Sequence, residues 1–462
     1  MLKKFIGDKA FYRRVMAIAL PIIMQNLITN FVSLLDNIMV GQLSTAQISA
    51  VTIANNNLLF IFNLCLFGGA AGAGIFTTQF HGSGDNEGIR HTFRFKLIIS
   101  LALTALGAGI FFFGSDPLIS LYLQGEGDPQ LAAETLAYGR QYLYIMLLGL
   151  LPFALTNAYA GTLRECGHPT VPMVAGLVAM AVNLVLNYIL IFGHFGAPAM
   201  GVSGAAVATV IARYVEFIIV ACWTHCNPEK NPYVPGLYRS LYIPGTLLKA
   251  IIIKGMPLLL NEGLWSFGMA ILNQCYSYCG LDVVPALSIS TTIYNLAAVV
   301  FRSLGNTVGI ITGQMLGAGR KEAEVRDSNN KLSALCVVSG TFFAAMAIVL
   351  SSAFPMIYNT TDAVRQLAAG LIIISAAAMP LQAYIFPVYF TLRAGGKTMI
   401  TFFFDCGSVW LLSIPIAFCF SRFSGLSILV IYALCQATDI IKCIIGYYLI
   451  KKGTWIQNLA AK

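Results

Sequence analysis

Apolar residues in this chain come in long runs separated by short polar loops, a pattern typical of membrane-spanning helices. A helix needs about 20 consecutive apolar residues to cross a hydrocarbon core roughly 30 Å thick. The sequence holds about twelve such runs, and in lipid a helix satisfies its own backbone polar groups. The pattern therefore predicts an all-α membrane protein. The predicted spans are residues 15–41, 51–79, 93–114, 136–160, 169–192, 201–223, 248–279, 285–315, 330–353, 366–392, 398–420 and 427–450.

Three short motifs occur twice in the same order, which indicates an internal repeat. The matched segments are 19–21 with 255–257, 78–84 with 313–319, and 162–164 with 391–393, at offsets of 236, 235 and 229 residues. Six spans separate the copies, so both halves cross the membrane in the same direction and form a parallel repeat. We expect two six-helix lobes with a site between them.

The repeat divides the chain into five predicted parts, with the linker marked by four prolines near its centre. These parts are a cytoplasmic N-terminal segment (1–14), an N-lobe (15–223), a cytoplasmic linker (224–247), a C-lobe (248–450) and a cytoplasmic tail (451–462).

Composition and charge support this interpretation. Hydrophobic residues make up 58% of the 462 residues and charged residues 10%, whereas about 25% of residues are charged in soluble domains. The net charge of +9 does not indicate nucleic-acid binding, because the positive charges are spread over alternate loops. Of the 28 Lys and Arg, three lie in loops on one side (Arg140, Arg365, Arg422), three lie within spans (Arg213, Arg302, Lys442) and the other 22 lie on the opposite side. The positive-inside rule then predicts that both termini are cytoplasmic. We expect a multi-pass protein of the plasma membrane.

One face of the first span is polar and carries an acidic residue, Asp36. At about 100° per residue, the residues that share this face are Gln25, Asn26, Thr29, Asn30, Ser33 and Asn37. A polar stripe this complete must line a cavity or another helix. An intramembrane carboxylate is costly and indicates a functional site. The alternative is a carboxylate that only packs against a neighbouring amide or arginine.

Glu262 is a second embedded carboxylate, in the first span of the second half. The residues on or beside its face are Trp265, Ser266, Met269, Asn273, Tyr276 and Ser277. A carboxylate with aromatic and thioether groups suits apolar cations. The alternative is ordinary packing between helices.

The other embedded charges favour structural roles. Arg213 and Glu216 are three residues apart on one predicted helix, as are Asp439 and Lys442, and such pairs can satisfy themselves. Asp405 and Arg302 have no partner nearby in sequence, so they are expected to pair with each other or with Arg393. Their roles stay open at this point.

The sequence has no signature of an enzyme. We find no nucleotide-binding loop, no metalloprotease motif and no Ser/His/Asp arrangement. We expect a protein that is not an enzyme, that has no cofactor and that takes its energy from an ion gradient. Cys222 and Cys226 flank His225, but eleven cysteines that lie mostly in apolar runs favour buried thiols over a metal site.

Several segments, in their order and spacing, resemble the multidrug and toxic compound extrusion (MATE) family. They are LLDNIMVGQLS (34–44), TQFHGSGD (78–85), GTLRECGHP (161–169), NLVLNYILIFGHFGAPAMGVSGAAVAT (183–209), GQMLGAG (313–319) and TLRAGGKT (391–398). The similarity covers essentially the whole chain. It implies twelve helices in two six-helix lobes, and export of mostly cationic, amphipathic compounds in exchange for sodium ions or protons.

The resemblance also implies roles for particular residues. Asp36 matches the acidic residue of the family's first helix, which is implicated in cation or proton coupling. Asn183 and Asn187 match the polar motif of the fifth helix. Glu262 matches the seventh-helix carboxylate of the sodium-coupled branch, whose tenth-helix aspartate is replaced here by Gln382. Asp36 and Glu262 are therefore the candidate sodium ligands, and Glu262 lacks its acidic partner.

The predicted function is secondary active antiport by alternating access, with small amphipathic cations as substrates and the lipid bilayer as surroundings. We expect a monomer that binds neither nucleic acid nor nucleotide. Candidate substrate-binding residues are Gln25, Asn26, Asn30, Ser33, Asn37, Trp265, Ser266, Met269, Asn273, Tyr276 and Gln382. A flippase for lipid-linked oligosaccharides is the alternative, although it would need a strongly cationic cavity. A membrane enzyme or an ion channel fits the repeat less well.

Overall fold

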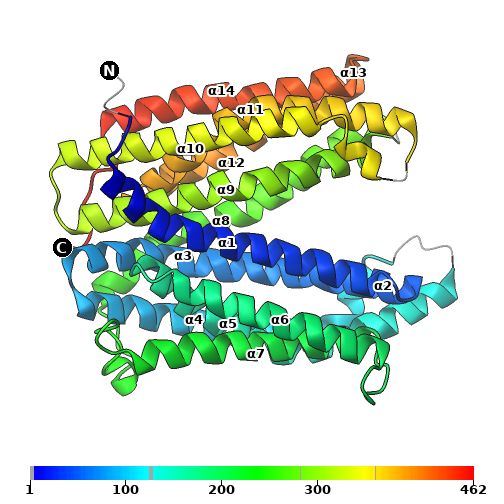
Figure 1. The fold of residues 1–462 in the computed structure, drawn as a ribbon, viewed down its shortest axis with the longest axis horizontal. Helices are drawn as coiled ribbons and strands as arrows, with labels where there is room; N and C mark the ends of the chain where they lie inside the picture. The colour runs from blue at the N-terminus through cyan, green and yellow to red at the C-terminus, as the bar shows by residue number, and fades with distance from the viewer. Residues whose placement is uncertain (1–4, 124–127, 281, 359, 462) are drawn as a thin grey trace. The chain divides into compact units, whose positions relative to one another are not determined.

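The structure is a computed structural model that describes residues 5–123, 128–280, 282–358 and 360–461. Six side chains within helices also lie outside the described residues: Ser33, Leu34, Asn37, Ile38, Asn56 and Asn57. All regular elements in the described ranges are helices, most of them long (Figure 1). The predicted all-α membrane fold is confirmed.

Each of the twelve predicted spans coincides with helical structure. The helices are α1 (Lys9–Val40), α2 (Thr45–Thr52), α3 (Phe60–Ser83), α4 (Asn86–Ser120), α5 (Pro129–Glu165), α6 (Thr170–Phe192), α7 (Val202–Cys226), α8 (Gly245–Ser277), α9 (Val283–Gly317), α10 (Glu322–Leu350), α11 (Asp362–Ala394), α12 (Thr398–Ser408), α13 (Ile414–Phe423) and α14 (Ile428–Lys452), with short 3₁₀ turns at Leu237–Arg239 and Phe354–Ile357. Among the described residues, eleven helical stretches are long and apolar enough to cross a membrane. The remaining predicted span coincides with α8, a helix of 33 residues that carries Lys249, Lys254 and Glu262.

Two spans contain a π-helix that the sequence pattern did not predict. The segment Ile53–Leu59 joins α2 to α3, and Val409–Ser413 joins α12 to α13. A π-turn shifts the register of the side chains that follow it. Each of these spans therefore changes the face that it presents partway along its length.

Local sequence explains where several helices begin and end. The Asp128 carboxylate accepts hydrogen bonds from the backbone N–H groups of Gln130 and Leu131, and Pro129 occupies the first turn of α5. Such a cap satisfies donors that the helix itself leaves unpaired. At the other end, α14 stops at Gly453, whose φ of 72° is left-handed, a conformation that glycine adopts without steric cost.

The chain forms two compact units. Unit 1 comprises Met1–Ile23, Thr78–Asp85 and Met256–Lys462; unit 2 comprises Met24–Thr77 and Asn86–Gly255. In unit 1, α11 packs against α9, α10 and α14, and in unit 2, α5 packs against α4 and α7 while α6 packs against α7 (Figure 1). The boundaries of the units fall inside α1, α3 and α8, whereas the sequence placed the lobe boundaries in loops.

The repeated glycine motif has a clear structural role within unit 1. A Cβ atom on Gly82 would lie 2.0 Å from the carbonyl oxygen of Gln314, and a Cβ atom on Gly317 would lie 1.8 Å from that of Gln79. Both pairs are related by the 235-residue offset of the repeat. The ends of α3 and α9 therefore approach each other reciprocally, and only glycine permits this distance. The two copies of this motif therefore contact each other symmetrically.

The linker folds onto unit 2 through Arg94 of α4. Its guanidinium donates hydrogen bonds to the carbonyl oxygens of Gly236, Leu237 and Tyr242, at 2.9, 2.8 and 3.1 Å. Nearby, the buried Tyr233 hydroxyl donates to Asn231. Burial raises the pKa of this hydroxyl well above its usual range, so Tyr233 stays a neutral donor.

The C-terminal segment folds in the same manner onto unit 1. Trp455 is fully buried, and its Nε1 donates to the Ile450 carbonyl at 3.1 Å. The Gln79 amide donates to the carbonyl oxygen of Gln457 at 3.2 Å and accepts from the Leu459 N–H at 2.5 Å. The last residues are therefore packed against the unit. The predicted tail is an integral part of its surface.

Candidate ion and substrate sites

Asp36 lies in the second half of α1 and binds an amide of α6. The Nδ2 atom of Asn187 donates to Asp36 Oδ1 at 2.7 Å and to Asn183 Oδ1 at 3.1 Å, and Asn183 Nδ2 donates to Thr209 on α7 at 3.4 Å. Asn183 and Asn187 are one helical turn apart, which places both on the face of α6 that points at α1. The structure thus brings together three of the four predicted coupling residues.

The surroundings of Asp36 leave oxygen atoms ready to bind a cation. Asn187 is 1% exposed, and its Oδ1 atom has no hydrogen-bond partner among the described residues. No Lys, Arg or His in the described part of the chain forms an ion pair with Asp36. A carboxylate beside an unsatisfied amide oxygen is a donor set that suits a hard cation. A proton on Asp36 would satisfy the same group by removing its charge.

Arg213 is the positive group that acts electrostatically on Asp36. Its guanidinium lies 4.7 Å from the centre of the Phe153 ring and donates to the Gly149 carbonyl at 3.4 Å. The predicted Arg213–Glu216 ion pair is wrong, because no such pair forms between these described residues. The three-residue spacing is compatible with a pair, but the ring and the carbonyl hold the guanidinium on α5.

The remaining residues of the polar stripe on α1 have different environments. Gln25 accepts a hydrogen bond from Arg164 at 3.0 Å. Asn26 and Asn30 are exposed in the structure. The predictions for Ser33 and Asn37 fall on side chains outside the described residues. The stripe therefore contains one carboxylate held by α6, one glutamine held by α5, and asparagines with accessible side chains.

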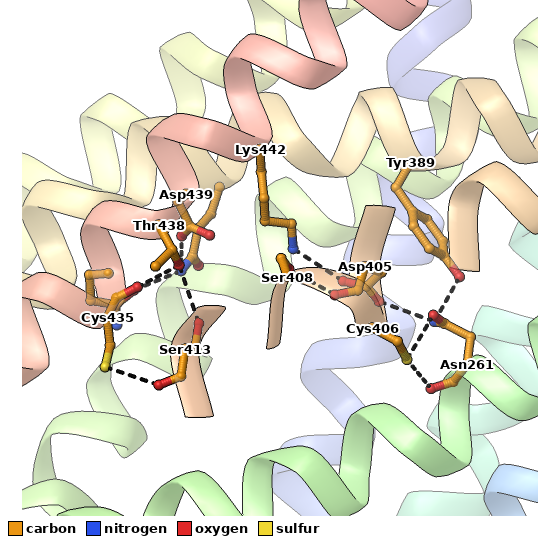
Figure 2. Close-up of polar contacts among 12 residues, drawn as sticks. Asn261, Tyr389, Asp405, Cys406, Ser408, Ser413, Cys435, Thr438, Asp439 and Lys442 are labelled. Atoms are coloured by element: carbon orange, nitrogen blue, oxygen red, sulfur yellow. Dashed lines mark hydrogen bonds and ion pairs between the residues drawn. The ribbon is translucent and has the colours of Figure 1, made fainter. Parts of the chain in front are cut away.

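Unit 1 contains a polar network around Asp405 (Figure 2). The Lys442 ammonium lies 3.3 Å from Asp405 Oδ1, and Asn261 Nδ2 donates to Asp405 Oδ2 at 3.1 Å. Asn261 also lies 3.5 Å from the Tyr389 hydroxyl. The predicted Asp439–Lys442 pair is therefore wrong: Lys442 extends from α14 to α12, where Asp405 offers a carboxylate that accepts its hydrogen bond.

The network continues through Gln382 to Asp439. Gln382 Nε2 donates to Asp439 Oδ2 at 3.1 Å, and Gln382 Oε1 accepts a hydrogen bond from Tyr294. Arg302 lies over the rings of Tyr294 and Phe386, at 5.8 and 5.5 Å. The expected pairing of Asp405 with Arg302 or Arg393 is wrong, because Asp405 binds Lys442. Arg302 does not pair with Asp405 because it lies against aromatic rings.

Glu262 and its neighbours are not gathered into one bonded cluster. Glu262 is half-buried, and Arg393 is the group that attracts it electrostatically. Trp265 and Met269 are half-buried and Asn273 is exposed. The Ser266 hydroxyl is buried without a hydrogen-bond partner in the described structure. Tyr276 is 3% exposed and packs on Tyr432 with ring centres 5.5 Å apart.

Sequence reasoning missed Asn261 and the Asp405–Lys442 pair as site residues. Asn261 precedes Glu262 and occupies another face of α8, so a search around the carboxylate's own face does not find it. Asp405 and Lys442 are 37 residues apart on different helices. The sequence did show that Asp405 and Lys442 are charged residues within predicted spans, and such residues need a partner of opposite charge.

No group of three or more metal-ligating side chains occurs in the described part of the chain. His225, which stands between Cys222 and Cys226, binds the Tyr159 hydroxyl at 2.9 Å and stacks on Tyr238. This histidine therefore joins α7, α5 and the linker.

Comparison with known sequences gives consistent matches in both halves. The MatE family model matches residues 21–189 and 257–419. A probable multidrug resistance protein NorM of Agrobacterium fabrum is 25% identical over 353 residues, covering 74% of this chain and 72% of that protein. The multidrug resistance protein MdtK of Edwardsiella ictaluri is 24% identical over 412 residues, covering 87% and 86%.

Solved structures share the fold. A crystal structure of a mutant of the Vibrio cholerae MATE transporter VcmN superposes with a TM-score of 0.86 at 18% identity, covering 98% of this chain and 99% of that one. A MOP superfamily transporter from Pyrococcus furiosus, described as having a binding pocket of reverse polarity, gives a TM-score of 0.82 at 18% identity, covering 98% and 97%.

Proposed function

Because the chain belongs to the MatE family, we propose that it is a secondary active antiporter that exports amphipathic, mostly cationic compounds in exchange for sodium ions or protons. Relatives across most of its length are named multidrug resistance proteins, which supports small-molecule efflux. The observation that carries the ion-coupling part is the environment of Asp36. It is an intramembrane carboxylate with an amide shell and no ion-pair partner among the described residues.

Competition at Asp36 would supply the coupling. A carboxylate that holds a sodium ion or a proton attracts a cationic substrate less strongly than a bare one. Binding of the ion therefore lowers the affinity for the substrate, and by linkage the substrate lowers the affinity for the ion by the same factor. Exchange of one monovalent ion for one monovalent cationic substrate moves no net charge across the membrane, so the concentration gradient of the ion supplies the energy that accumulates substrate outside.

Asn183 and Asn187 would position the Asp36 carboxylate in this scheme. Asn187 donates both to the carboxylate and to Asn183 Oδ1, and so holds Asp36 against α6. The unpartnered Asn187 Oδ1 would join Asp36 as an oxygen ligand if the ion is sodium. If the ion is a proton, Asn187 Nδ2 would stay bonded to the unprotonated oxygen of the neutral acid.

Trp265 and Met269 of α8 supply an aromatic surface and a thioether of the kind that bind flat organic cations. We propose that they contribute to substrate binding together with Glu262, while Tyr276 supports them from the core. The distribution of Lys and Arg supports both termini in the cytoplasm, so that substrate enters from the side that carries the termini.

Transport into proteoliposomes of defined protein orientation tests the proposal. A fluorescent organic cation is followed while a sodium gradient and a proton gradient are imposed separately. We expect transport driven by one of them, and a collapse when the appropriate ionophore is added. Absence of transport under both gradients, in protein that elutes as a single folded species, would contradict the antiporter. Transport of a lipid-linked sugar by the same protein would then favour the flippase.

A further inference from the structure

Lys442 is an embedded cation that the proposed transport cycle does not use. It is 9% exposed, and its ammonium lies 3.3 Å from Asp405 Oδ1 and 5.6 Å from the centre of the Phe404 ring. It also attracts Asp439, one turn earlier on α14. A lysine buried at this depth in a membrane protein requires compensating negative charge.

Without Lys442, unit 1 would have more embedded carboxylates than cations close enough to neutralise them. The embedded acids there are Glu262, Asp405 and Asp439. Arg393 attracts Glu262, and Arg302 lies against aromatic rings instead of an acid. Lys442 is therefore the cation that neutralises Asp405, whereas Asp439 accepts a hydrogen bond from the amide of Gln382.

The carboxylate beside the ammonium is the kind of ligand that a small cation takes. It belongs to Asp405 and is already positioned by the Asn261 amide. Carboxylate and amide oxygens are the groups that hard cations prefer. The Asp405 carboxylate lies between Lys442 and Asn261 (Figure 2). A free sodium ion in place of the ammonium would satisfy the same carboxylate charge.

We propose that Lys442 is a tethered cation that takes the place of an exchangeable ion in unit 1, and so confines ion coupling to Asp36 in unit 2. The part of this inference that concerns coupling rests on the proposed ion-coupled export. The structural content of the inference is that the ammonium excludes sodium from Asp405. Removing the ammonium should therefore create a sodium site where the native chain has none.

The experiment measures thermal unfolding of purified full-length protein in detergent, in sodium chloride and in choline chloride at equal ionic strength. All variants carry Asp36→Asn, so that the first carboxylate contributes nothing. The Asp36→Asn protein should unfold at the same temperature in both salts. Adding Lys442→Gln should lower the unfolding temperature in choline, and sodium should raise it again, saturably, by about 3 °C.

Two further variants identify the site. Adding Asp405→Asn to the Lys442→Gln protein should abolish the sodium effect. Lys331→Gln is the matched control, because Lys331 pairs with Asp327 at a more exposed position, and it should produce no sodium dependence. A folded Lys442→Gln protein that responds equally to both salts would overturn the proposal.

A second measurement does not depend on the Lys442 variants folding. Binding of radioactive sodium to the Asp36→Asn protein, with Lys442 intact, should stay at background. Saturable binding that Asp405→Asn removes would show that sodium reaches Asp405 beside the lysine, and would overturn the proposal. Both readouts measure binding without transport. A failure of the antiporter hypothesis would therefore leave them unchanged.

Discussion

Asp36 in unit 2 and Asp405 in unit 1 are both embedded aspartates, yet the two units satisfy them differently. Asp36 accepts a hydrogen bond from an asparagine and has no ion-pair partner in the described chain, whereas Asp405 accepts one from Asn261 and also binds Lys442. The amide is the common element, and the ammonium is the difference. In unit 2 the acid lies on α1 and the amide on α6, whereas in unit 1 the amide lies on α8 and the acid on α12. The acid and the amide therefore exchange places between the two halves, and a fixed cation joins the pair only in unit 1.

This difference separates an exchangeable site from a structural one. A carboxylate without a resident cation can gain and lose an ion at moderate cost. A carboxylate with a covalently attached ammonium cannot lose its partner, and breaking such a pair typically costs about 3–5 kcal/mol because one charge stays buried.

Asp36→Asn should reduce gradient-driven efflux to the level of protein-free liposomes. The amide keeps the size of the side chain but can neither bind a proton nor attract a cation at full strength. Efflux in oriented proteoliposomes is the measurement. Asp116→Asn is the control, because Asp116 forms a half-exposed pair with Arg140, and it should transport normally. Full efflux by Asp36→Asn would remove the residue on which the coupling hypothesis depends.

Asp405→Asn should act mainly on stability. It leaves the Lys442 ammonium buried without its carboxylate, and we expect a loss of about 3–5 kcal/mol, read as a lower unfolding temperature. The double variant Asp405→Asn/Lys442→Met should recover much of this loss because both charges are gone. If Asp405→Asn unfolds at the native temperature but loses all coupling, Asp405 is an exchange site and the two units are alike.

Lys96 and Lys331 occupy equivalent positions of the repeat, 235 residues apart. Removing the buried Lys96 should destabilise the protein more than removing Lys331. Lys96 is 1% exposed and bonded to Glu165 and to Thr162. Lys331 forms a pair with Asp327, whose side chain is half-exposed. Lys96→Met should therefore be strongly destabilising, since Glu165 loses a buried partner. Lys331→Met should cost at most about 1 kcal/mol. Equal unfolding temperatures for the two variants would show that burial does not determine the strength of these pairs.

Glu262→Gln should have the smallest effect on coupling. Glu262 is half-buried, and no hydrogen bond or ion pair joins it to another described residue. We expect the initial rate of gradient-driven efflux to change by no more than about fivefold, with the ion requirement unchanged. A loss as complete as that of Asp36→Asn would mean that both units take part in coupling.

The sequence predicted the helices well because the bilayer sets a minimum length for every span. It also requires each span to satisfy its own backbone hydrogen bonds as a helix. The sequence also named Asp36, Asn183 and Asn187 as coupling residues through the resemblance of the motifs that contain them, but it did not predict the hydrogen bond that joins Asn187 to Asp36. The paired glycines at 82 and 317 were visible as a repeat, but their reciprocal approach to Gln314 and Gln79 requires the packed helices.

The partners of embedded charges were the main failure. Lys442 lies three residues from Asp439, and helix spacing favours that pair, yet the ammonium binds Asp405 on another helix. Which of two acids a long side chain reaches depends on the packing of α12 against α14, and periodicity does not encode that packing. The same holds for Trp455, which looks like part of a polar tail and lies fully buried.

Release of the coupling ion by substrate tests whether the ion and the substrate compete at Asp36. An organic cation is added to purified protein, and displaced protons or radioactive sodium are counted in weakly buffered solution. We predict release of about one ion per native protein, the same release from Asp405→Asn/Lys442→Met, and none from Asp36→Asn. Undiminished release from Asp36→Asn would contradict the claim that substrate and ion compete at this carboxylate.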